Sequence, residues 1–173
     1  MSDGLLEAFR HNAWANRELL AVCKNLTGEQ LAASATGTYG SVLSTLQHIL
    51  DAEASYRERI SEEAPDWAEK VEQVTDLDEL QGYAWDMERY WEDLLGSGFD
   101  PDRVLRWYSP YRQANVEAPV SVLTAQTLNH GNEHRSQVCT VLTTIGVEPP
   151  ELDVWSYATA TSRIRTEPGP PPA

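Results

Sequence analysis

The chain has 173 residues, of which 41% are hydrophobic and 23% are charged, as in an ordinary globular protein with a core of its own. Its formal net charge of −14 disfavours the basic patch that nucleic acid or an anionic membrane surface requires. No apolar run approaches the roughly 18 residues of a membrane span, and residues 1–10 do not resemble a signal peptide. We therefore expect a protein of the cytoplasm that binds neither nucleic acid nor membrane.

Four stretches carry apolar residues at helical spacing. They cover residues 3–24, 41–61, 76–96 and 119–146. Asp76 and Glu79 fit a capping box at the start of the third, and Gly96 suits its end. Pro119 suits the first turn of the fourth. Four long amphipathic helices in one small domain predict an all-α four-helix bundle.

The remaining segments are shorter. Residues 100–118 contain β-forming side chains with Ser109-Pro110 as a turn, which predicts either a short hairpin or an ordered loop. A short helix is expected around residues 154–157. We expect a single domain over residues 1–165 and a disordered Pro-rich tail over residues 166–173.

The two cysteines, Cys23 and Cys139, are far apart in the sequence and form no CxxC motif. This pattern argues against a disulfide framework and suits a reducing compartment. We expect both to be small buried apolar residues, with a redox role as the alternative.

Two histidines of the fourth predicted helix, His130 and His134, are four residues apart. This spacing places both imidazoles on one helix face, so both can reach one ion. At 3.6 residues per turn, His134 lies in the middle of the inward stripe and His130 at its edge. Inward imidazoles are costly unless they are hydrogen-bonded or metal-bound. The spacing thus leaves two interpretations open, a pair of satisfied core histidines or two metal ligands.

His48 is the candidate for a third ligand from another helix. The same projection places it opposite the apolar stripe of its own helix, so periodicity alone indicates a solvent-facing side chain. Its small neighbours would nevertheless suit the wall of a pocket. His11 points away from its stripe and is interpreted as a surface residue. Asn12 and Asn16 fall within that stripe and need buried partners, either to orient a metal ligand or, as we expect, for structure.

Three sequence segments resemble the DinB family of metal-dependent enzymes, over about residues 5–157. Residues 11–16, His-Asn-Ala-Trp-Ala-Asn, are similar to that family's Tyr-Asn-x-Trp-Ala-Asn opening, with His11 in place of tyrosine. Residues 44–53 resemble the segment that supplies the first metal histidine. The most specific match is an Asn-His-x-x-x-His-Arg-x-Gln pattern that begins at Asn129, with Ser136 where glycine is common.

The resemblance implies a four-helix bundle with one crossover connection, paired as a homodimer. It also implies one divalent metal ion on His48, His130 and His134, with zinc or nickel expected ahead of iron. Three neutral imidazoles with an open position are typical of a catalytic site for such ions. Relatives include thiol S-transferases and a thiol-dependent isomerase, so we expect a metal-dependent transferase that uses a low-molecular-weight thiol on a small-molecule substrate. Five aromatic residues are candidates for lining the pocket, although packing is expected for most of them: Trp14, Tyr39, Trp107, Tyr108 and Trp155.

Two other functions stay open. Residues 130–134 match the H-x-x-E-H pattern of inverted zinc proteases, with Glu133 as general base, but the pattern is short and Glu133 is expected on a solvated or dimer-facing surface. The other is a non-catalytic, stress-linked metal-binding dimer, which a fourth protein ligand would favour. Asp51, Glu53 and Glu133 are the carboxylates nearest in sequence, and we expect them to be solvated.

Overall fold

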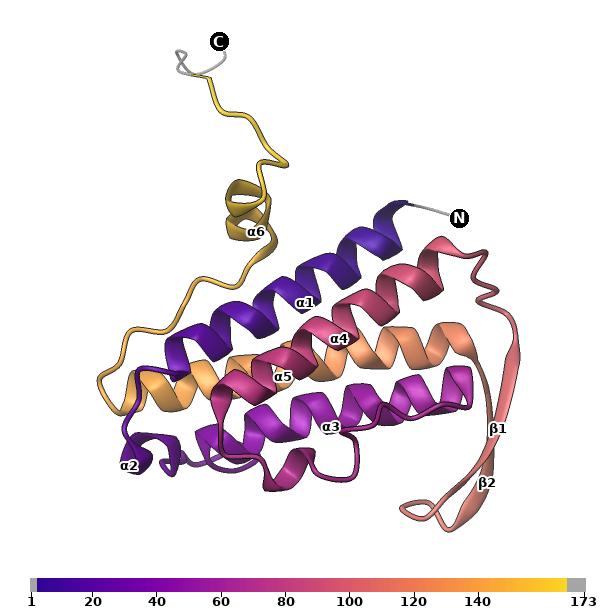
Figure 1. Cartoon of the computed structure of the whole chain (residues 1–173), viewed down its shortest axis with the longest axis horizontal. Coiled ribbons are helices and arrows are strands. Elements are labelled where there is room, and N and C mark those ends of the chain that lie inside the picture. Colours follow the sequence, from indigo (N-terminus) through magenta and orange to yellow (C-terminus); the bar gives the residue numbers. More distant parts are fainter. Residues whose placement is uncertain (1–2, 168–173) are drawn as a thin grey trace.

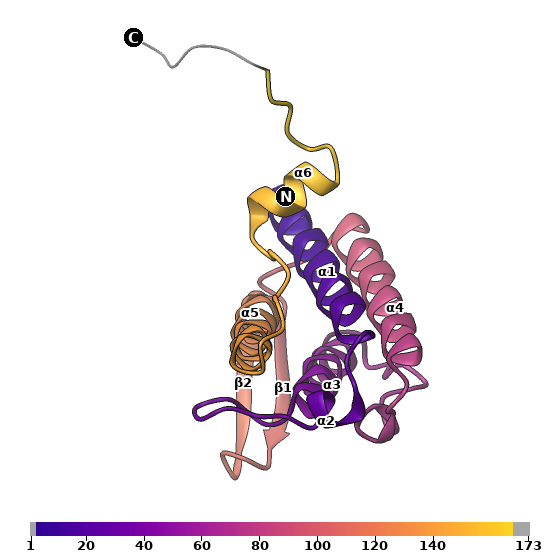
Figure 2. The ribbon, with the colours of Figure 1, turned by 90° about the vertical axis from the view of Figure 1, so that its left-hand side faces the viewer.

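The computed structural model describes residues 3–167. Its main elements are four long helices, α1 (Asp3–Cys23), α3 (Val42–Ser61), α4 (Leu77–Gly96) and α5 (Val120–Thr144). They run alongside one another, α1 packing on α4 and α5, and α3 packing on α5 and α4 (Figures 1 and 2). The structure is therefore mostly helical, and the four long helices lie within a few residues of their predicted bounds.

Three short helices complete the described chain. The predicted one is α6 (Val154–Ala160), which follows α5. The α2 turn (Gly28–Leu31) and the 3-10 turn η1 (Val71–Gln73) were not predicted, because an element of three or four residues is too short to show a period. Within the described residues, no helix is long and apolar enough to cross a membrane.

The helix starts differ in detail from the sequence prediction. The Asp76 side chain caps α4 by accepting a hydrogen bond from the Asp78 N–H at 2.9 Å. The Glu79 carboxylate does not complete a capping box, because it accepts hydrogen bonds from Lys70 and from the Tyr83 hydroxyl instead. Pro119 is the N-cap of α5 and not part of its first turn.

A β-hairpin connects α4 to α5. Strands β1 (Val104–Ser109) and β2 (Ala114–Pro119) pair antiparallel, with Trp107 opposite Val116. The hairpin extends beside the end of α3, as Figure 1 shows. Of the two predictions for this segment, the hairpin is therefore correct.

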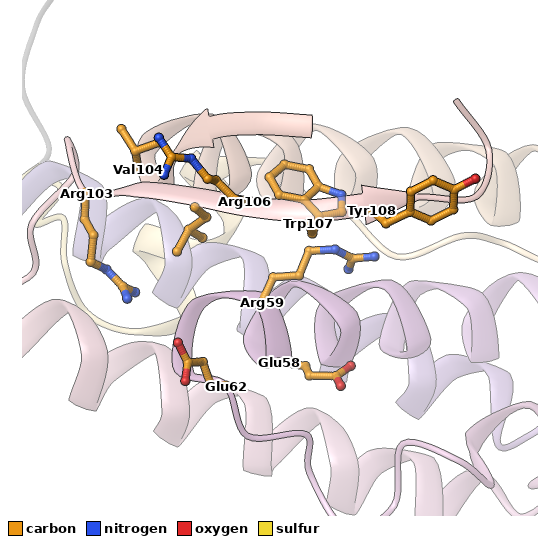
Figure 3. Close-up of a pocket in the computed structure, with 9 residues that line it drawn as sticks. Glu58, Arg59, Glu62, Arg103, Val104, Arg106, Trp107 and Tyr108 are labelled. Atoms are coloured by element: carbon orange, nitrogen blue, oxygen red, sulfur yellow. The ribbon is translucent and has the colours of Figure 1, made fainter. Parts of the chain in front are cut away.

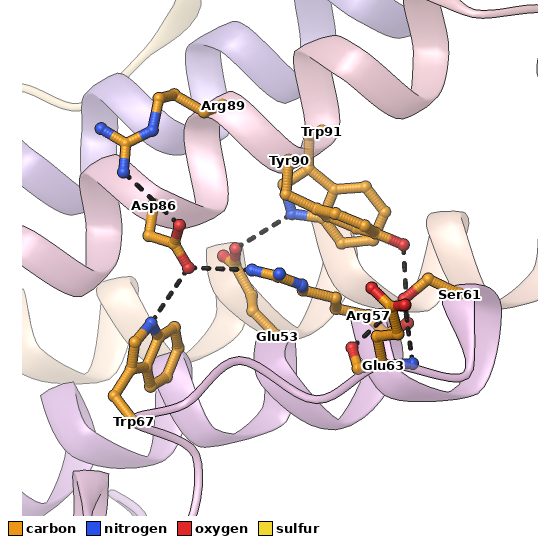
Figure 4. A network of polar contacts seen from close by, with 9 residues as sticks. All are labelled: Glu53, Arg57, Ser61, Glu63, Trp67, Asp86, Arg89, Tyr90 and Trp91. Carbon is orange, nitrogen blue, oxygen red and sulfur yellow. Dashed lines mark hydrogen bonds and ion pairs between the residues drawn. The ribbon is translucent and has the colours of Figure 1, made fainter.

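The hydrophobic core lies between the four long helices. Phe9 of α1 and Trp91 of α4 are each 1% exposed, and their ring centroids are 4.4 Å apart. Polar contacts add to this packing between α3 and α4, where Asp86 accepts hydrogen bonds from Arg57 and from the Trp67 indole (Figure 4). Buried ring area and these hydrogen bonds together fix the relative position of the helices.

The segment that follows α5 folds back over α1. The His11 ring is half-buried there, and its Nε2–H donates to the Leu152 carbonyl at 2.7 Å. Trp14 and Tyr157 pack beside it with ring centroids 5.7 Å apart. The surface interpretation of His11 was wrong, because the helical period of α1 does not report that a later segment covers this face. Most of the predicted disordered tail, residues 168–173, lies outside the described residues.

Candidate metal centre

The packing of α3 against α5 brings His48, His130 and His134 together. Their candidate ligand nitrogens all lie within 4.8 Å of one another. The Nε2 atoms of His48 and His130 are 3.1 Å apart, and the rings of His130 and His134 are 4.3 Å apart. Among the described residues, this cluster contains no carboxylate or thiol. The three histidines singled out in the sequence thus converge on one point.

Burial keeps two of these imidazoles neutral. It lowers the pKa of His130 to about 4, with further lowering from the neighbouring His134 and His48. Burial also lowers the pKa of His48, again helped by His134, while Glu72 acts in the opposite direction. A neutral imidazole has a free lone pair on one ring nitrogen, so at neutral pH these side chains are in the form that binds a metal.

The arrangement fits a divalent ion. Zinc binds imidazole nitrogens at about 2.0–2.1 Å, so two such ligands at a tetrahedral angle lie about 3.3 Å apart. The 3.1 Å between the Nε2 atoms of His48 and His130 is close to this separation. A neutral imidazole has one ring nitrogen without a proton, so each member of the trio can offer one lone pair to an ion. This donor set suits zinc, nickel or ferrous iron.

Tyr39 and Gln137 surround the histidines. The Tyr39 ring stacks on His48 at 4.0 Å with an interplanar angle of 8°, and it meets the edge of His134 at 5.3 Å. The Gln137 Oε1 atom lies 3.0 Å from His134 Nδ1 and accepts a hydrogen bond from the Tyr39 N–H at 2.9 Å. Gln137 closes the sequence pattern that begins at Asn129, and this periodicity on α5 is the signal that could have identified it.

Comparison with known proteins identifies the family of the chain. The family model described as DinB family matches residues 1–169. The chain belongs to the DinB family. No curated protein matches the chain significantly.

A second polar cluster in this DinB-family chain joins α1 to α3 and α5. Glu53 accepts hydrogen bonds from the side-chain amides of Asn12 and Asn16, both at 2.9 Å, and from the Trp91 indole at 3.2 Å. Arg135 donates to the oxygens of the same two asparagines, both at 2.7 Å. The asparagines therefore have a structural role, as predicted. The expectation that Glu53 is solvated was wrong, since it is 2% exposed.

Burial lowers the pKa of the arginine at the centre of this second cluster. Arg135 is 3% exposed, and its burial lowers the guanidinium pKa to about 10, an effect that Glu53 opposes. The guanidinium is still charged at neutral pH. The two asparagines thus form a hydrogen-bonded bridge between the buried Arg135 and the buried Glu53.

Gly131, between the two α5 histidines, is required by this second cluster. A Cβ atom there would lie 2.7 Å from Asn12 Oδ1 and 2.8 Å from Arg135 Nη1. Both atoms are held by their hydrogen bonds, so neither can move away freely. The absent side chain lets α1 approach α5 between the two histidines.

The carboxylates considered in the sequence are not at the DinB-family histidine cluster. Glu133 is exposed on α5, as expected. Asp51 is half-buried, and burial raises its pKa, with Glu72 adding to the rise. No described histidine, cysteine, aspartate or glutamate joins the three histidines, so the cluster could offer an ion three nitrogens.

The two thiols are shielded. Cys23 is fully buried, which raises its pKa to about 12. Cys139 is half-buried, and burial raises its pKa as well. Both are free, and neither has the lowered pKa of a reactive thiol, which agrees with the expected apolar role.

A cavity of about 740 Å³ lies between the end of α3 and β1 (Figure 3). Arg59, Trp107 and Tyr108 are among its lining residues, and no histidine of the cluster is. His48 and Arg59 are eleven residues apart on α3, or about 16 Å along the helix axis. This cavity is therefore separate from the histidine cluster.

The five aromatic candidates divide between several regions. Tyr39 contacts the histidines, while Trp107 and Tyr108 line the hairpin cavity. Trp14 packs beneath α6, and Trp155 is 73% exposed. Tyr39 is thus the one member of this set that the structure places at the candidate metal centre.

Proposed function

We propose that the chain binds one divalent metal ion on His48, His130 and His134, and that this centre belongs to an enzyme acting on small molecules. The observation that carries the proposal is the convergence of three imidazoles, two of them with lowered pKa values, on one point. Zinc and nickel are the first candidates and ferrous iron the next. We also propose the four-helix bundle with one crossover connection, a homodimer and a cytoplasmic location.

The reaction that we propose is the transfer of a low-molecular-weight thiol to an electrophile. The thiol loses its proton, its sulfur bonds to the electrophilic carbon, and that carbon releases a leaving group or the adduct takes up the proton. A divalent ion with an open position supplies the chemistry by lowering the pKa of a bound thiol. The chain's own residues hold the site ready: burial keeps His48 and His130 neutral, and Tyr39 shields one face of His48. The buried Glu53 cluster holds α3 and α5 against α1, so the ligands stay in place.

Metal content tests the binding step. Purified protein is loaded with zinc or nickel, passed through a desalting column and measured by elemental analysis. His48→Ala, His130→Ala and His134→Ala should each lose most of the metal, because two remaining imidazoles bind far more weakly. His11→Ala is the matched control and should retain it, since His11 contacts the Leu152 carbonyl and not the cluster. A wild-type protein that retains no metal would overturn the proposal.

A panel of thiols and electrophiles tests the reaction. We expect the metal-loaded protein to accelerate conjugation of at least one small thiol, and His130→Ala to lose this activity. If metal-loaded protein conjugates no thiol in a broad panel, S-transfer is wrong even though the metal centre stands.

The two alternatives have less support. An H-x-x-E-H hydrolase needs Glu133 beside the ion, whereas this residue is exposed and lies outside the histidine cluster. A purely structural metal favours a closed set of four ligands, whereas the described residues offer three. The open position thus favours catalysis over both.

A further inference from the structure

The loop between α2 and α3 reaches the candidate metal centre through Tyr39. Hydrogen bonds hold this loop, with the Val42 N–H donating to the Ala33 carbonyl at 3.0 Å and the Thr38 hydroxyl donating to the Ala35 carbonyl at 2.8 Å. Gly37 has a φ of +86°, a conformation that favours glycine. The loop thus presents Tyr39 to the histidines even though this side chain is 53% exposed.

The side-chain oxygen of Gln137 joins the loop to a metal ligand. Tyr39 offers its backbone N–H, which can only donate, so the Gln137 atom that faces it must be the amide oxygen and not the amide nitrogen. The same oxygen lies 3.0 Å from His134 Nδ1. An amide oxygen only accepts, so His134 must carry its proton on Nδ1. The backbone of the loop therefore determines the tautomer of the histidine.

This tautomer leaves Nε2 of His134 free to bind a metal ion. With the proton on Nδ1, the lone pair of His134 is on Nε2, and the ring is held at a fixed angle on α5. Hydrogen bonds to the second ring nitrogen are the usual means by which proteins orient metal-binding histidines, and their loss typically costs 10- to 100-fold in affinity.

We propose that Gln137 is a positioning residue that fixes the tautomer and orientation of His134, and that the Tyr39 loop in turn fixes Gln137. The inference rests on the proposed metal site for its consequence but not for its geometry. The loop and the metal centre are then coupled. An ordered loop orients His134 for metal binding, and a bound ion stabilises the loop in return.

The first test compares the zinc affinity of variants by competition with a chelator. Gln137→Leu removes the acceptor at similar size and should raise the dissociation constant about 10- to 100-fold. Gln137→Glu retains an accepting oxygen and should bind within a few-fold of wild type, or more tightly. Gln126→Leu makes the same change at an exposed position of α5 and should bind as wild type does. If the wild type binds zinc and Gln137→Leu binds it with equal affinity, the role of Gln137 is refuted while the proposed metal site stands.

The second test needs no metal. In the metal-free protein, nitrogen NMR should find His134 protonated on Nδ1, and Gln137→Leu should shift it to a mixture of tautomers. Hydrogen exchange of the Tyr39 amide should become faster in this variant, while the Val42 amide keeps its protection because its acceptor is the Ala33 carbonyl. A wild type that binds no zinc would overturn the metal proposal, and these two readouts would still decide the role of Gln137. An unchanged tautomer in Gln137→Leu would refute that role.

Discussion

Helices α3 and α5 carry two polar clusters that differ in how their polar groups are satisfied. Glu53 and Arg135 belong to the Glu53 cluster, and His48 and His134 belong to the histidine cluster. In the Glu53 cluster, the side-chain nitrogens of Asn12 and Asn16 donate to Glu53, and their oxygens accept from Arg135. In the histidine cluster, three imidazoles face one another, and each neutral ring can offer one nitrogen to an ion.

The difference shows how polar groups in one interior can have different uses. The Glu53 cluster is complete within the protein, so it fixes how α1, α3 and α5 pack. The histidine cluster could hold a metal ion, because three imidazoles converge on one point. If this comparison is correct, changes to the Glu53 cluster should alter stability, whereas changes to the histidine cluster should alter metal binding.

The largest expected effect is that of Arg135→Met. Removing the guanidinium leaves Glu53 as a buried charge without its counterion, which should lower the free energy of unfolding by about 3–5 kcal/mol. Urea denaturation measures the change. Arg106→Met is the matched control, because the Arg106–Glu117 pair is exposed and screened by solvent, so its loss should leave the free energy of unfolding almost unchanged. If Arg135→Met lowers the free energy of unfolding by less than about 1 kcal/mol, the Glu53 cluster is not structural.

A bound metal ion should stabilise the protein through the histidine cluster. Zinc at about 100 times its dissociation constant should raise the free energy of unfolding by about 2.7 kcal/mol, because only the folded chain brings the histidines together. Denaturation with and without zinc measures this gain. His130→Ala should lose most of it, and a gain that this variant retains in full would place the ion elsewhere.

Gly131→Ala should have a smaller effect. The added Cβ meets Asn12 and Arg135 below 3 Å, so we expect a loss of about 1–3 kcal/mol from overpacking. Gly82→Ala in α4 is a control of opposite sign, since a Cβ there meets nothing within 4 Å and alanine favours the helix by about 1 kcal/mol. Thermal melts of both variants give the comparison. Equal stabilisation by both would mean that α1 does not approach α5 as closely as described.

The smallest expected effect is that of Glu133→Ala. This carboxylate is exposed, so stability should change by less than about 0.5 kcal/mol. Metal affinity should also stay as in wild type, in contrast to His134→Ala one residue away. A marked loss of zinc binding in Glu133→Ala, measured by chelator competition, would revive the hydrolase interpretation.

The sequence predicted what repeats at a helical period. The long helices and the shared face of His130 and His134 follow from spacing, and the structure brings both histidines to one place. His48 and Glu53 did not follow, because an apolar stripe reports the hydrophobic core and not a face that is buried against polar partners. Only the family resemblance placed His48 at the site. Tyr39 lies in a loop, where no period indicates which way a side chain points.

The burial of Cys23 and Cys139 has a consequence for an enzyme of the proposed kind. A catalyst that handles electrophiles risks alkylating its own sulfur atoms. One thiol here is sealed in the core and the other is partly covered, and burial raises the pKa of both. At neutral pH almost no protein thiolate is present to compete for the substrate, so self-inactivation is suppressed by the fold itself.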